Sequence, residues 1–423
     1  MPARRDKSVR TNAIRRRRVL GAGLIGVSGM ASTFMAGSAT PIPVGTLSLG
    51  APKRMARLHV DADGALLAVS LDGELWRLAS DSWRLLGQGL DPSSLLASGH
   101  RRVVGRGRDG GLWVLESGRA SQQARPRLAP HAGLLMLALG VIAVAVGREG
   151  RHHVIRLEPG ASGWSETARS KEVVLPDARP VQFDPSGTTN DDNGHVAVFG
   201  GPDAARYRHG VLGDDIEATS LLLLERHGME TMARLDLPAP FVFEDIAPRP
   251  IAWQGRRGLL TVRSGPQGAQ LAVAAPAGGD SGRFALAALG APIGAAQRWL
   301  SPSTDGVRLL AVHTPHLGGV LHRYRLDGDR LVGEVVARDV TNHMIGHREL
   351  DMSAWVDRIW VVPKQDRRGL RFFAFDSNAG ALRSRDMKLE LPVLALHRWQ
   401  RHGQAGVAVL LQNGSVAWTS ATP

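Results

Sequence analysis

The sequence predicts an all-β fold, a β-propeller of seven or eight blades in a single ring, and three observations support it. Short apolar runs of about four to eight residues recur and end at Gly, Asp or Asn, while sustained i, i+3, i+4 apolar patterns are nearly absent. Asp-Gly and Asn-Gly pairs, which suit two-residue hairpins, stand between many of these runs. Groups of three or four runs return about every 35 to 60 residues, the spacing of propeller blades.

Glycine and asparagine mark the expected turns because they tolerate the positive φ of tight hairpins. A β-sandwich array is the competing fold, but it seldom spaces its hairpins so regularly. The turn pairs are Asp63-Gly64, Asp72-Gly73, Asp109-Gly110, Asp305-Gly306, Asp327-Gly328 and Asn413-Gly414. The blades are expected to start near Ala56, Ser94, His131, Pro180, Phe241, Gln297, Gly346 and Val393.

The first segment in chain order, residues 1–39, resembles a twin-arginine export signal. Arg16 and Arg17 are followed by one residue and then by the apolar pair Val19-Leu20, within a long basic stretch. A Gly/Ala/Ser-diluted apolar run and the small residues before Thr40 complete the pattern of a cleavable signal. We therefore expect a periplasmic protein whose mature chain is residues 40–423, with an uncleaved N-terminal anchor as the alternative.

The net charge of +13 is largely a property of this signal. Removing residues 1–39 takes away eight Lys/Arg and one Asp, which leaves the mature chain at about +6. The remaining arginines are interspersed with acids rather than grouped in a basic stripe, so no nucleic-acid partner is expected. The chain has no cysteine, which excludes disulfides, thiolate metal sites, cysteine nucleophiles and a lipid-anchored cysteine.

The ring itself is expected to fill residues 40–423. The closing segment 393–420 is short enough to share a blade with the strand at 44–50, and this sharing would remove the free sheet edges. The most apolar stretch, 134–147, has an internal glycine and is too short for a comfortable membrane span, so it predicts buried central strands. Residues 158–194 are rich in loop-forming residues and predict an excursion beyond the ring.

Five strings in the second half resemble secreted bacterial FG-GAP or VCBS-repeat proteins, whose repeats form an integrin-α-like β-propeller. The resemblance implies seven blades and an extracytoplasmic recognition or adhesion module. It covers under half the chain, and the order of the strings is its specific element. They are RYRHGVLGDDIEA (206–218), FEDIAPRPIAW (243–253), APIGAAQRWLSP (291–302), HTPHLGGVLHRYRL (313–326) and TNHMIGHREL (341–350).

The calcium loops of that family look eroded in this chain. Where family members carry an Asp-rich hairpin, this sequence reads IAWQGRRGLL, STDGVRLL and DMSAWVDRIW. Calcium prefers six to eight oxygen ligands, several of them carboxylates, which these segments do not supply. The loop at 184–194 offers Asp184, Asp191 and Asp192, but a solvated surface loop with Asx-turns is the favoured interpretation. No cofactor is predicted, and calcium stays a possible ligand of that one loop.

No catalytic motif stands out. The nucleophile elbow, the phosphate loop, the dinucleotide fingerprint and the HExxH helix are all missing. The histidine pairs 152/153, 313/316 and 343/347 each lack an evident third metal ligand, and the odd spacing of His313 and His316 places them on opposite faces of an extended strand. The sequence favours a protein without enzymatic activity, and no metal site is assigned.

The candidate binding residues are the polar members of the five family-like strings. Such positions recur once per blade and are expected to converge around the central channel, where they suit a polar or anionic ligand. The competing interpretation is that the same side chains tie neighbouring blades together. The prediction is a binding module for a protein partner or a cell-surface polysaccharide, with a quinone-dependent dehydrogenase-like or lyase-like propeller enzyme as the alternative. The candidate residues are Arg206, His209, Glu244, Asp245, Arg249, Trp299, His316, His343, Arg348 and Glu349.

Overall fold

The computed structural model describes residues 46–123, 125–185, 194–277, 283–375 and 382–421. Within these residues the regular structure is β-strand, apart from two single-turn 3-10 helices, η1 (Arg148–Gly150) and η2 (Gly210–Leu212). No helix in this described part is long and apolar enough to cross a membrane. The signal predicted at residues 1–39 lies outside it.

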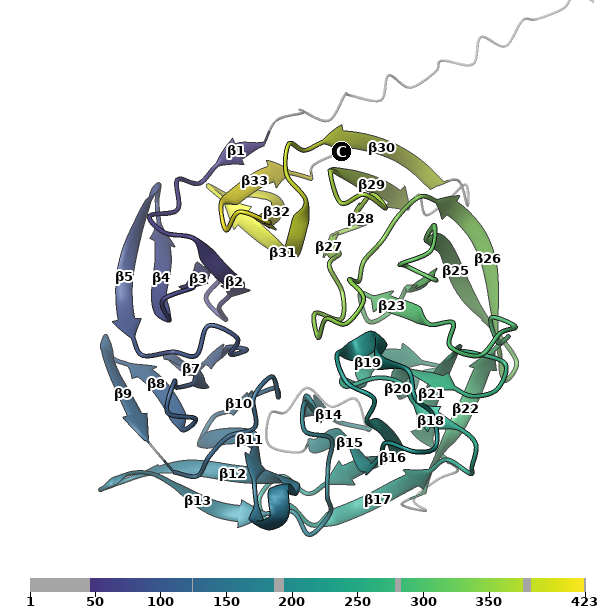
Figure 1. The fold of residues 1–423 in the computed structure, drawn as a ribbon, viewed down its shortest axis with the longest axis horizontal. Coiled ribbons are helices and arrows are strands. Elements are labelled where there is room, and N and C mark those ends of the chain that lie inside the picture. Colours follow the sequence, from purple (N-terminus) through teal and green to yellow (C-terminus); the bar gives the residue numbers. More distant parts are fainter. Residues whose placement is uncertain (1–45, 124, 186–193, 278–282, 376–381, 422–423) are drawn as a thin grey trace, which may run out of the picture. The chain divides into compact units, whose positions relative to one another are not determined.

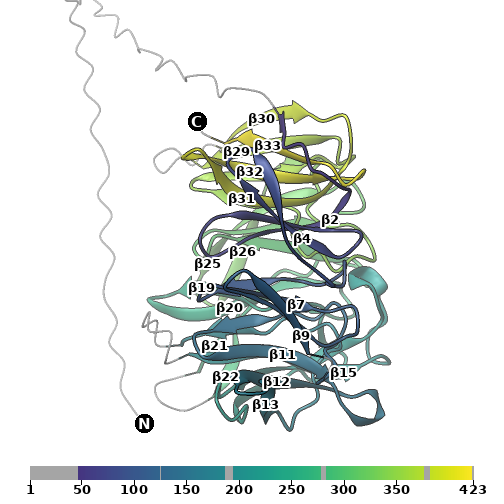
Figure 2. The ribbon, with the colours of Figure 1, turned by 90° about the vertical axis from the view of Figure 1, so that its left-hand side faces the viewer.

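The described strands form five separate four-stranded sheets and one thirteen-stranded sheet, which joins three more four-stranded meanders. These eight blades stand in a ring as a β-propeller (Figure 1). Each blade is an antiparallel meander whose first strand is innermost, and Figure 2 shows the blades edge-on. Blade 1 contains β2 (Met55–Val60), β3 (Leu66–Ser70), β4 (Glu74–Ala79) and β5 (Ser82–Gln88), and blade 2 contains β6 (Ala97–Gly99), β7 (Arg102–Arg106), β8 (Leu112–Glu116) and β9 (Arg119–Gln123). Blade 3 contains β10 (Leu135–Leu137), β11 (Gly140–Val146), β12 (His152–Gly160) and β13 (Gly163–Arg169), and blade 4 contains β14 (Val181–Phe183), β15 (His195–Asp203), β16 (Glu217–Leu224) and β17 (Thr231–Asp236).

Blade 5 contains β19 (Arg249–Trp253), β20 (Arg256–Ser264), β21 (Gln270–Pro276) and β22 (Phe284–Gly290), and blade 6 contains β23 (Leu300–Thr304), β24 (Leu309–His313), β25 (Val320–Asp327) and β26 (Arg330–Arg338). Blade 7 contains β27 (Ala354–Val356), β28 (Ile359–Pro363), β29 (Gly369–Phe375) and β30 (Leu382–Lys388), and blade 8 contains β31 (Val393–Arg401), β32 (Gln404–Leu411), β33 (Val416–Ser420) and β1 (Leu47–Ser48).

Blades 4, 5 and 6 are joined through additional strand pairings. The short strand β18 (Val242–Phe243) pairs with β16 of blade 4 and with β20 of blade 5, and β22 of blade 5 pairs in parallel with β26 of blade 6.

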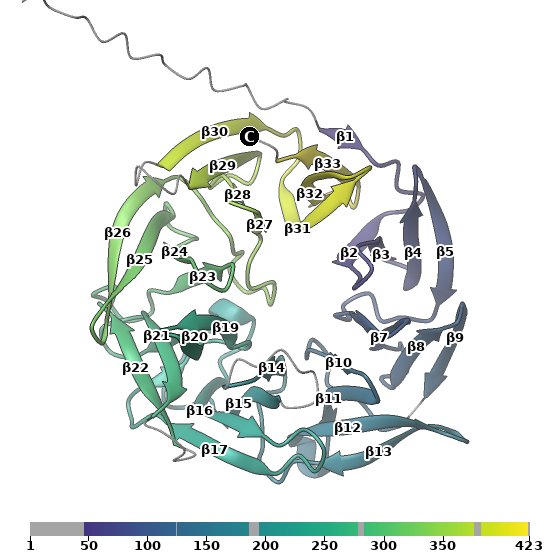
Figure 3. The same cartoon turned by 180° about the vertical axis from the view of Figure 1, so that it is seen from behind.

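The two ends of the described chain close the ring within blade 8. Strand β1 pairs antiparallel with β33 and supplies the fourth strand, as the sequence predicted. The innermost strand β2 then contacts β31 across the junction, visible from behind in Figure 3. Apolar side chains seal this junction, among them Met55 and Leu66 of blade 1 and Ala408 of blade 8. Covering both edges removes a site for edge-to-edge aggregation.

The turn and strand predictions are confirmed at several places. The glycines of all six predicted turn pairs have positive φ, between +61° at Gly328 and +90° at Gly306. The apolar stretch 134–147 forms the hairpin of β10 and β11, and β11 is almost wholly buried. Eight groups form where the family resemblance implies seven, and their first strands begin within several residues of the predicted starts.

The predicted excursion over residues 158–194 is wrong for much of its length. Residues 163–169 form β13, the outermost strand of blade 3, and 181–183 form β14 at the start of blade 4. The polar and glycine-rich composition of 158–169 reflects a tight turn and an exposed outer strand, which needs few apolar residues. Residues 186–193, with Asp191 and Asp192, lie outside the described residues.

Candidate functional site

The predicted site residues belong to one face of the ring, which we call the loop face. In an antiparallel meander, the loops between second and third strands and the connections between blades emerge on the same side. The loop face is turned to the viewer in Figure 1 and carries η1 and η2. Its segments 204–216, 244–248, 291–299, 314–319 and 339–353 contain almost all of the candidate residues.

Glu244 follows β18 and is a fully buried acid. Its Oε1 accepts a hydrogen bond from His209 Nδ1 at 2.5 Å, and its Oε2 accepts one from Ser264 Oγ. Its backbone oxygen accepts the indole N–H of Trp299 at 3.1 Å. Burial raises the pKa of Glu244, and the hydrogen bond from His209 opposes that rise. The carboxylate of Glu244 therefore joins the loop between β15 and β16 to the end of β20, and its backbone oxygen holds Trp299 of the next connection.

Asp245, the next residue, is also fully buried. Its Oδ1 accepts the backbone N–H groups of residues 246 and 247 at 2.9 and 3.3 Å. Its Oδ2 accepts Arg249 Nη1 at 2.7 Å and Thr261 Oγ1 at 3.2 Å. The carboxylate is thus surrounded by donors of its own blade, which identifies it as the anchor of the connection into β19.

Trp299 organises a histidine pair on the loop face. Its indole is parallel to the His316 ring, with centroids 6.4 Å apart, and lies 4.7 Å from the His343 ring. His343 Nε2 lies 2.7 Å from the carbonyl oxygen of residue 347, so this nitrogen carries the proton. His343 Nδ1 then accepts from His316 Nε2 at 2.9 Å. Burial lowers the pKa of His343 to about 3 and that of His316 to about 4, so both rings are neutral.

Arg348 crosses from the connection before blade 7 to blade 4. Its Nε donates to Asp177 Oδ2 at 2.7 Å and its Nη2 to Asp214 Oδ2 at 2.6 Å. Gly213 has a φ of +107°, and a Cβ there would lie 2.7 Å from Arg348 Nη1, so only glycine lets the guanidinium approach. The carbonyl of Arg348 in turn accepts from Arg179. These contacts fix the 344–349 loop over the channel.

Two further contacts support the same loops. Arg206 Nη1 donates to the carbonyl oxygens of Leu237 and Phe241 at 3.0 and 3.3 Å, which braces the connection out of blade 4. Asp351 accepts Asn342 Nδ2 at 3.1 Å and Ser353 Oγ at 2.5 Å, and burial raises its pKa to about 6. We refer to the mutually bonded residues His209, Glu244, Asp245, Arg249, Trp299, His316 and His343 as the packed cluster.

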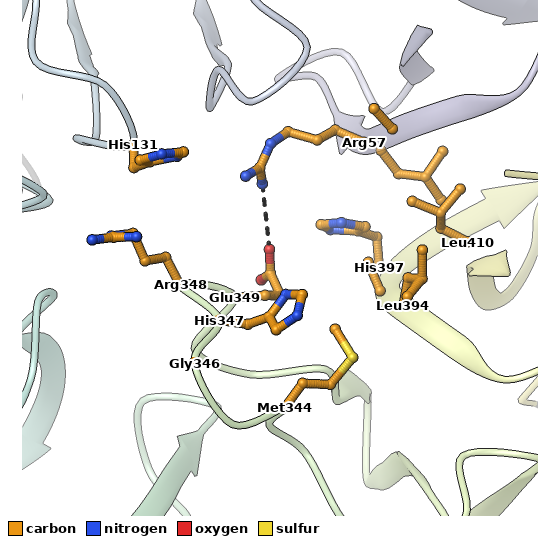
Figure 4. A pocket seen from close by; sticks show the side chains of 13 residues that line it. Arg57, His131, Met344, Gly346, His347, Arg348, Glu349, Leu394, His397 and Leu410 are labelled. Carbon is orange, nitrogen blue, oxygen red and sulfur yellow. Dashed lines mark ion pairs between the residues drawn. The ribbon is translucent and has the colours of Figure 1, made fainter. Parts of the chain in front are cut away.

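A hollow of about 300 Å³ opens beside the packed cluster, and we call it the channel pocket (Figure 4). It is framed by innermost strands β2 and β31, by the connection into blade 3 and by the 344–349 loop. Its lining residues are Ala56, Arg57, Leu58, His131, Met344, Gly346, His347, Arg348, Glu349, Leu394, Ala395, His397 and Leu410.

The channel pocket has charged groups of both signs in its interior. Arg57 points into it and faces Glu349 at 3.6 Å, an ion pair longer than a direct hydrogen bond (Figure 4). Burial lowers the pKa of His131, and the nearby Arg348 and Arg57 lower it further. Burial also lowers the pKa of His397, where Glu349 and Arg57 act in opposite directions. Arg57 and Glu349 thus face each other across the pocket, while Arg348 is paired with Asp177 and Asp214.

The ten candidate residues are divided between these places. Arg348 and Glu349 line the channel pocket, and His316 and His343 line a second hollow of about 310 Å³ that shares Met344 and His347 with it. Six others line neither hollow and are held by the contacts described above: Arg206, His209, Glu244, Asp245, Arg249 and Trp299.

The sequence patterns missed Arg57, His131, His347 and His397 as pocket residues. His347 was noted only as one member of a histidine pair. Arg57 and His397 lie on innermost strands whose inward direction depends on register, and a strand residue changes face with each single step. His131 has a left-handed φ of +65°, an unusual conformation that only the structure reveals.

In the described part of the chain, no group of three or more His, Cys, Asp or Glu side chains that could hold a metal ion converges. His313 stacks on His322 at 3.6 Å and lies 2.6 Å from the Tyr324 hydroxyl, whereas His316 turns to His343. The two histidines are apart, but not on opposite faces of one strand: β24 ends at His313, and His316 lies in the turn that follows. The calcium expectation for residues 184–194 concerns mainly residues outside the described ranges.

The sequence matches no family model and no curated protein. Among solved structures the chain is similar to Sqt1 of Saccharomyces cerevisiae, with a TM-score of 0.59, 11% identity, and coverage of 89% of this chain and 98% of that one. It also matches the WD40 β-propeller domain of Doa1 (TM-score 0.41, 10% identity, 89% and 96% covered) and a protein from Lactobacillus plantarum (0.40, 13%, 75% and 92%). At such identities the similarity to Sqt1 shows the fold alone. The resemblance to FG-GAP or VCBS-repeat proteins stays a prediction.

Proposed function

We propose that this protein is an exported, non-enzymatic β-propeller that binds a partner protein on its loop face. The observation that carries the proposal is the channel pocket together with the hollow beside it. The two share Met344 and His347, so they form one recess in the sense that an extended ligand passing over these two side chains reaches both. Propeller faces commonly bind ligands where loops of several blades converge.

The contacts of the packed cluster favour binding over catalysis. A general acid or base must reach a substrate, yet the carboxylate of Glu244 is fully buried and hydrogen-bonded to His209 and Ser264. The rings of His316 and His343 are likewise committed to each other and to Trp299. These groups stabilise the loop face, and the residues left to contact a ligand line the two hollows.

The lining of the recess favours a protein partner over a polysaccharide. The described residues around the channel pocket include no Trp, Tyr or Phe, the side chains on which sugar rings usually stack. Ile345, beside the shared Met344, is 65% exposed and offers an apolar contact for a peptide side chain. A recess with the apolar Ile345 at its rim and the guanidinium of Arg57 in its interior suits a peptide that carries an apolar and an acidic residue.

Site-specific photo-crosslinking tests this function. A benzophenone amino acid replaces Ile345 in the full chain, and a matched variant carries it at Val335, which is 52% exposed on the outer strand β26. The proposal predicts a discrete protein adduct in cells from position 345 and none from position 335. Equal adduct patterns from both positions, or a defined catalytic turnover by the purified protein, would contradict it.

Export forms a separate part of the proposal and rests on the sequence of residues 1–39 alone. Replacing Arg16 and Arg17 by lysine preserves the charge but removes the twin-arginine pattern. The double variant is expected to accumulate in the cytoplasm, whereas the parent chain is recovered from the periplasm. Unchanged fractionation of the double variant would overturn the assignment of the export route.

A further inference from the structure

We propose that the channel pocket binds a carboxylate of an acidic segment of the partner protein, with Arg57 as its ion-pair partner and Glu349 as the internal group that the ligand displaces. This inference rests on the proposed function and specifies the ligand chemistry of its site. Glu349 is a chain-borne carboxylate already directed at Arg57 across the pocket (Figure 4). The geometry thus shows which ionic group the cavity accommodates.

Arg57 is available to a ligand in a way that Arg348 is not. Arg348 donates to two carboxylates at 2.6 and 2.7 Å, which neutralise its charge. Arg57 has only the Glu349 contact at 3.6 Å, and its Nε is buried and donates to no acceptor among the described residues. A buried donor without an acceptor keeps its desolvation cost, so an incoming carboxylate that accepts from Arg57 offsets a cost already present in the fold.

The neighbourhood of Arg57 also favours an anion. The Nε of Arg179 is likewise buried without an acceptor in the described structure. Arg179 also interacts electrostatically with both Glu349 and Arg57. His131 and His397 add imidazole nitrogens that can donate or accept around the same space. A planar guanidinium can hold a carboxylate through two parallel hydrogen bonds, which a loose pair at 3.6 Å does not achieve.

The shape of the recess indicates a peptide rather than a free ion. A single carboxylate fills only part of the 300 Å³ pocket, and the adjoining hollow continues past Met344 to Pro315 and Ile345. Those residues supply apolar surface, and Arg367, which also lines the adjoining hollow, donates to the carbonyl oxygen of Val393. An acidic residue in the channel pocket with its neighbours lying over Met344 and Ile345 uses both hollows.

Fluorescence anisotropy on the folded protein tests this assignment with a short labelled peptide of alternating Glu and Gly residues. Arg57→Gln is expected to weaken binding about ten-fold or more, the loss of a charge-assisted hydrogen bond. Arg84→Gln, the same change on the exposed strand β5 of the same blade, is the control and is expected to bind as the parent does. Glu349→Gln is expected to bind the peptide several-fold more tightly, because the internal competitor is gone.

The opposite response of Glu349→Gln separates ligand exchange from a structural role, which would weaken binding or leave it unchanged. Equal binding by Arg57→Gln and Arg84→Gln would overturn the proposal, as would equal binding of the Gln–Gly counterpart peptide. Inorganic phosphate and citrate serve as competitors, and a small anion that binds through Arg57 when the acidic peptide does not bind would also overturn it. If a partner protein crosslinks at position 345 and the Arg57→Gln variant binds that partner as well as the parent does, the proposed function is supported and this inference is refuted.

Discussion

The packed cluster and the channel pocket lie side by side on one face of the ring, yet their polar groups are treated in opposite ways. In the packed cluster the acids Glu244 and Asp245 are fully buried, and each has two or more hydrogen-bond donors. In the channel pocket the guanidinium of Arg57 has one distant partner. Buried carboxylates with several donors specify a fold, whereas the guanidinium of Arg57, with a loose ion pair inside a hollow, is placed where a ligand carboxylate gains free energy. Arg249 of the packed cluster also has a buried Nη2 without an acceptor in the described structure, but it lines neither hollow.

The largest expected difference between the two regions is in stability. Trp299→Ala removes a buried indole that packs on His316 and His343 and donates to Glu244, and it is expected to lower the free energy of unfolding by about 3–5 kcal/mol. His347→Ala, at an exposed side chain of the pocket, is expected to change it by less than about 0.5 kcal/mol. Urea titrations of both variants make the comparison. Similar losses in the two variants would remove the distinction between the regions.

Arg348 stands at the boundary and tests how the regions are joined. Arg348→Gln leaves the carboxylate of Asp177, which is almost wholly buried, without its ion pair, and a loss of about 3 kcal/mol is expected. Its second partner, Asp214, is more exposed and should contribute less. Asp214→Asn should therefore cost under about 1 kcal/mol in the same urea titration. A larger effect at Asp214 than at Arg348 would contradict this ranking.

The pH dependence of stability reports on the packed histidines. Burial lowers the pKa of His343 to about 3 from an ordinary 6.5, so the folded chain keeps this ring neutral while the unfolded chain protonates it. The stabilisation is complete above pH 6.5 and is lost as the pH falls toward the folded-state pKa. The difference in unfolding free energy between the parent and His343→Gln is expected to shrink by up to about 1.4 kcal/mol per pH unit below pH 6. A pH-independent difference would show that the ring is not buried in its neutral form.

The smallest effect is expected at the rim of the recess. Ile345→Ser removes an apolar side chain that is mostly exposed in the free protein, so stability should change by less than about 0.5 kcal/mol. Affinity for a peptide that carries a leucine beside its glutamate should fall several-fold, from the lost apolar contact. Affinity for the Glu–Gly peptide should be unchanged. A fall in both affinities would place Ile345 in the ionic part of the site.

The ring and its closure could be predicted because their causes are local in the sequence. Hairpin glycines such as Gly64 and Gly414 need positive φ, and the apolar runs between them alternate with turns. The pairing of β1 with β33 follows from the need to cover sheet edges. The third-blade strand β13 was missed because an outer strand with one solvated face lacks a distinctive apolar pattern.

The candidate site could be predicted in its region but not in its division of roles. Polar residues that recur once per blade do meet on the loop face. The composition of the strings does not show which of these residues form hydrogen bonds with one another and are therefore not free to bind a ligand. Glu244 and His209 are separated by 35 positions, and their contact makes both structural. Arg57 reaches the pocket through ring closure with blade 8, so its partner Glu349 is far away in the sequence. Such pairings arise from tertiary packing.

Hydrogen exchange with and without the acidic peptide tests the central claim most directly, because it reads both regions in one experiment. Binding in the channel pocket predicts slower exchange in residues 55–60, 344–349 and 393–401. It predicts no change in residues 244–249, where Asp245 is already hydrogen-bonded to Arg249 and Thr261. Protection confined to 244–249, or no protection in the pocket segments at a saturating peptide concentration, would contradict the account.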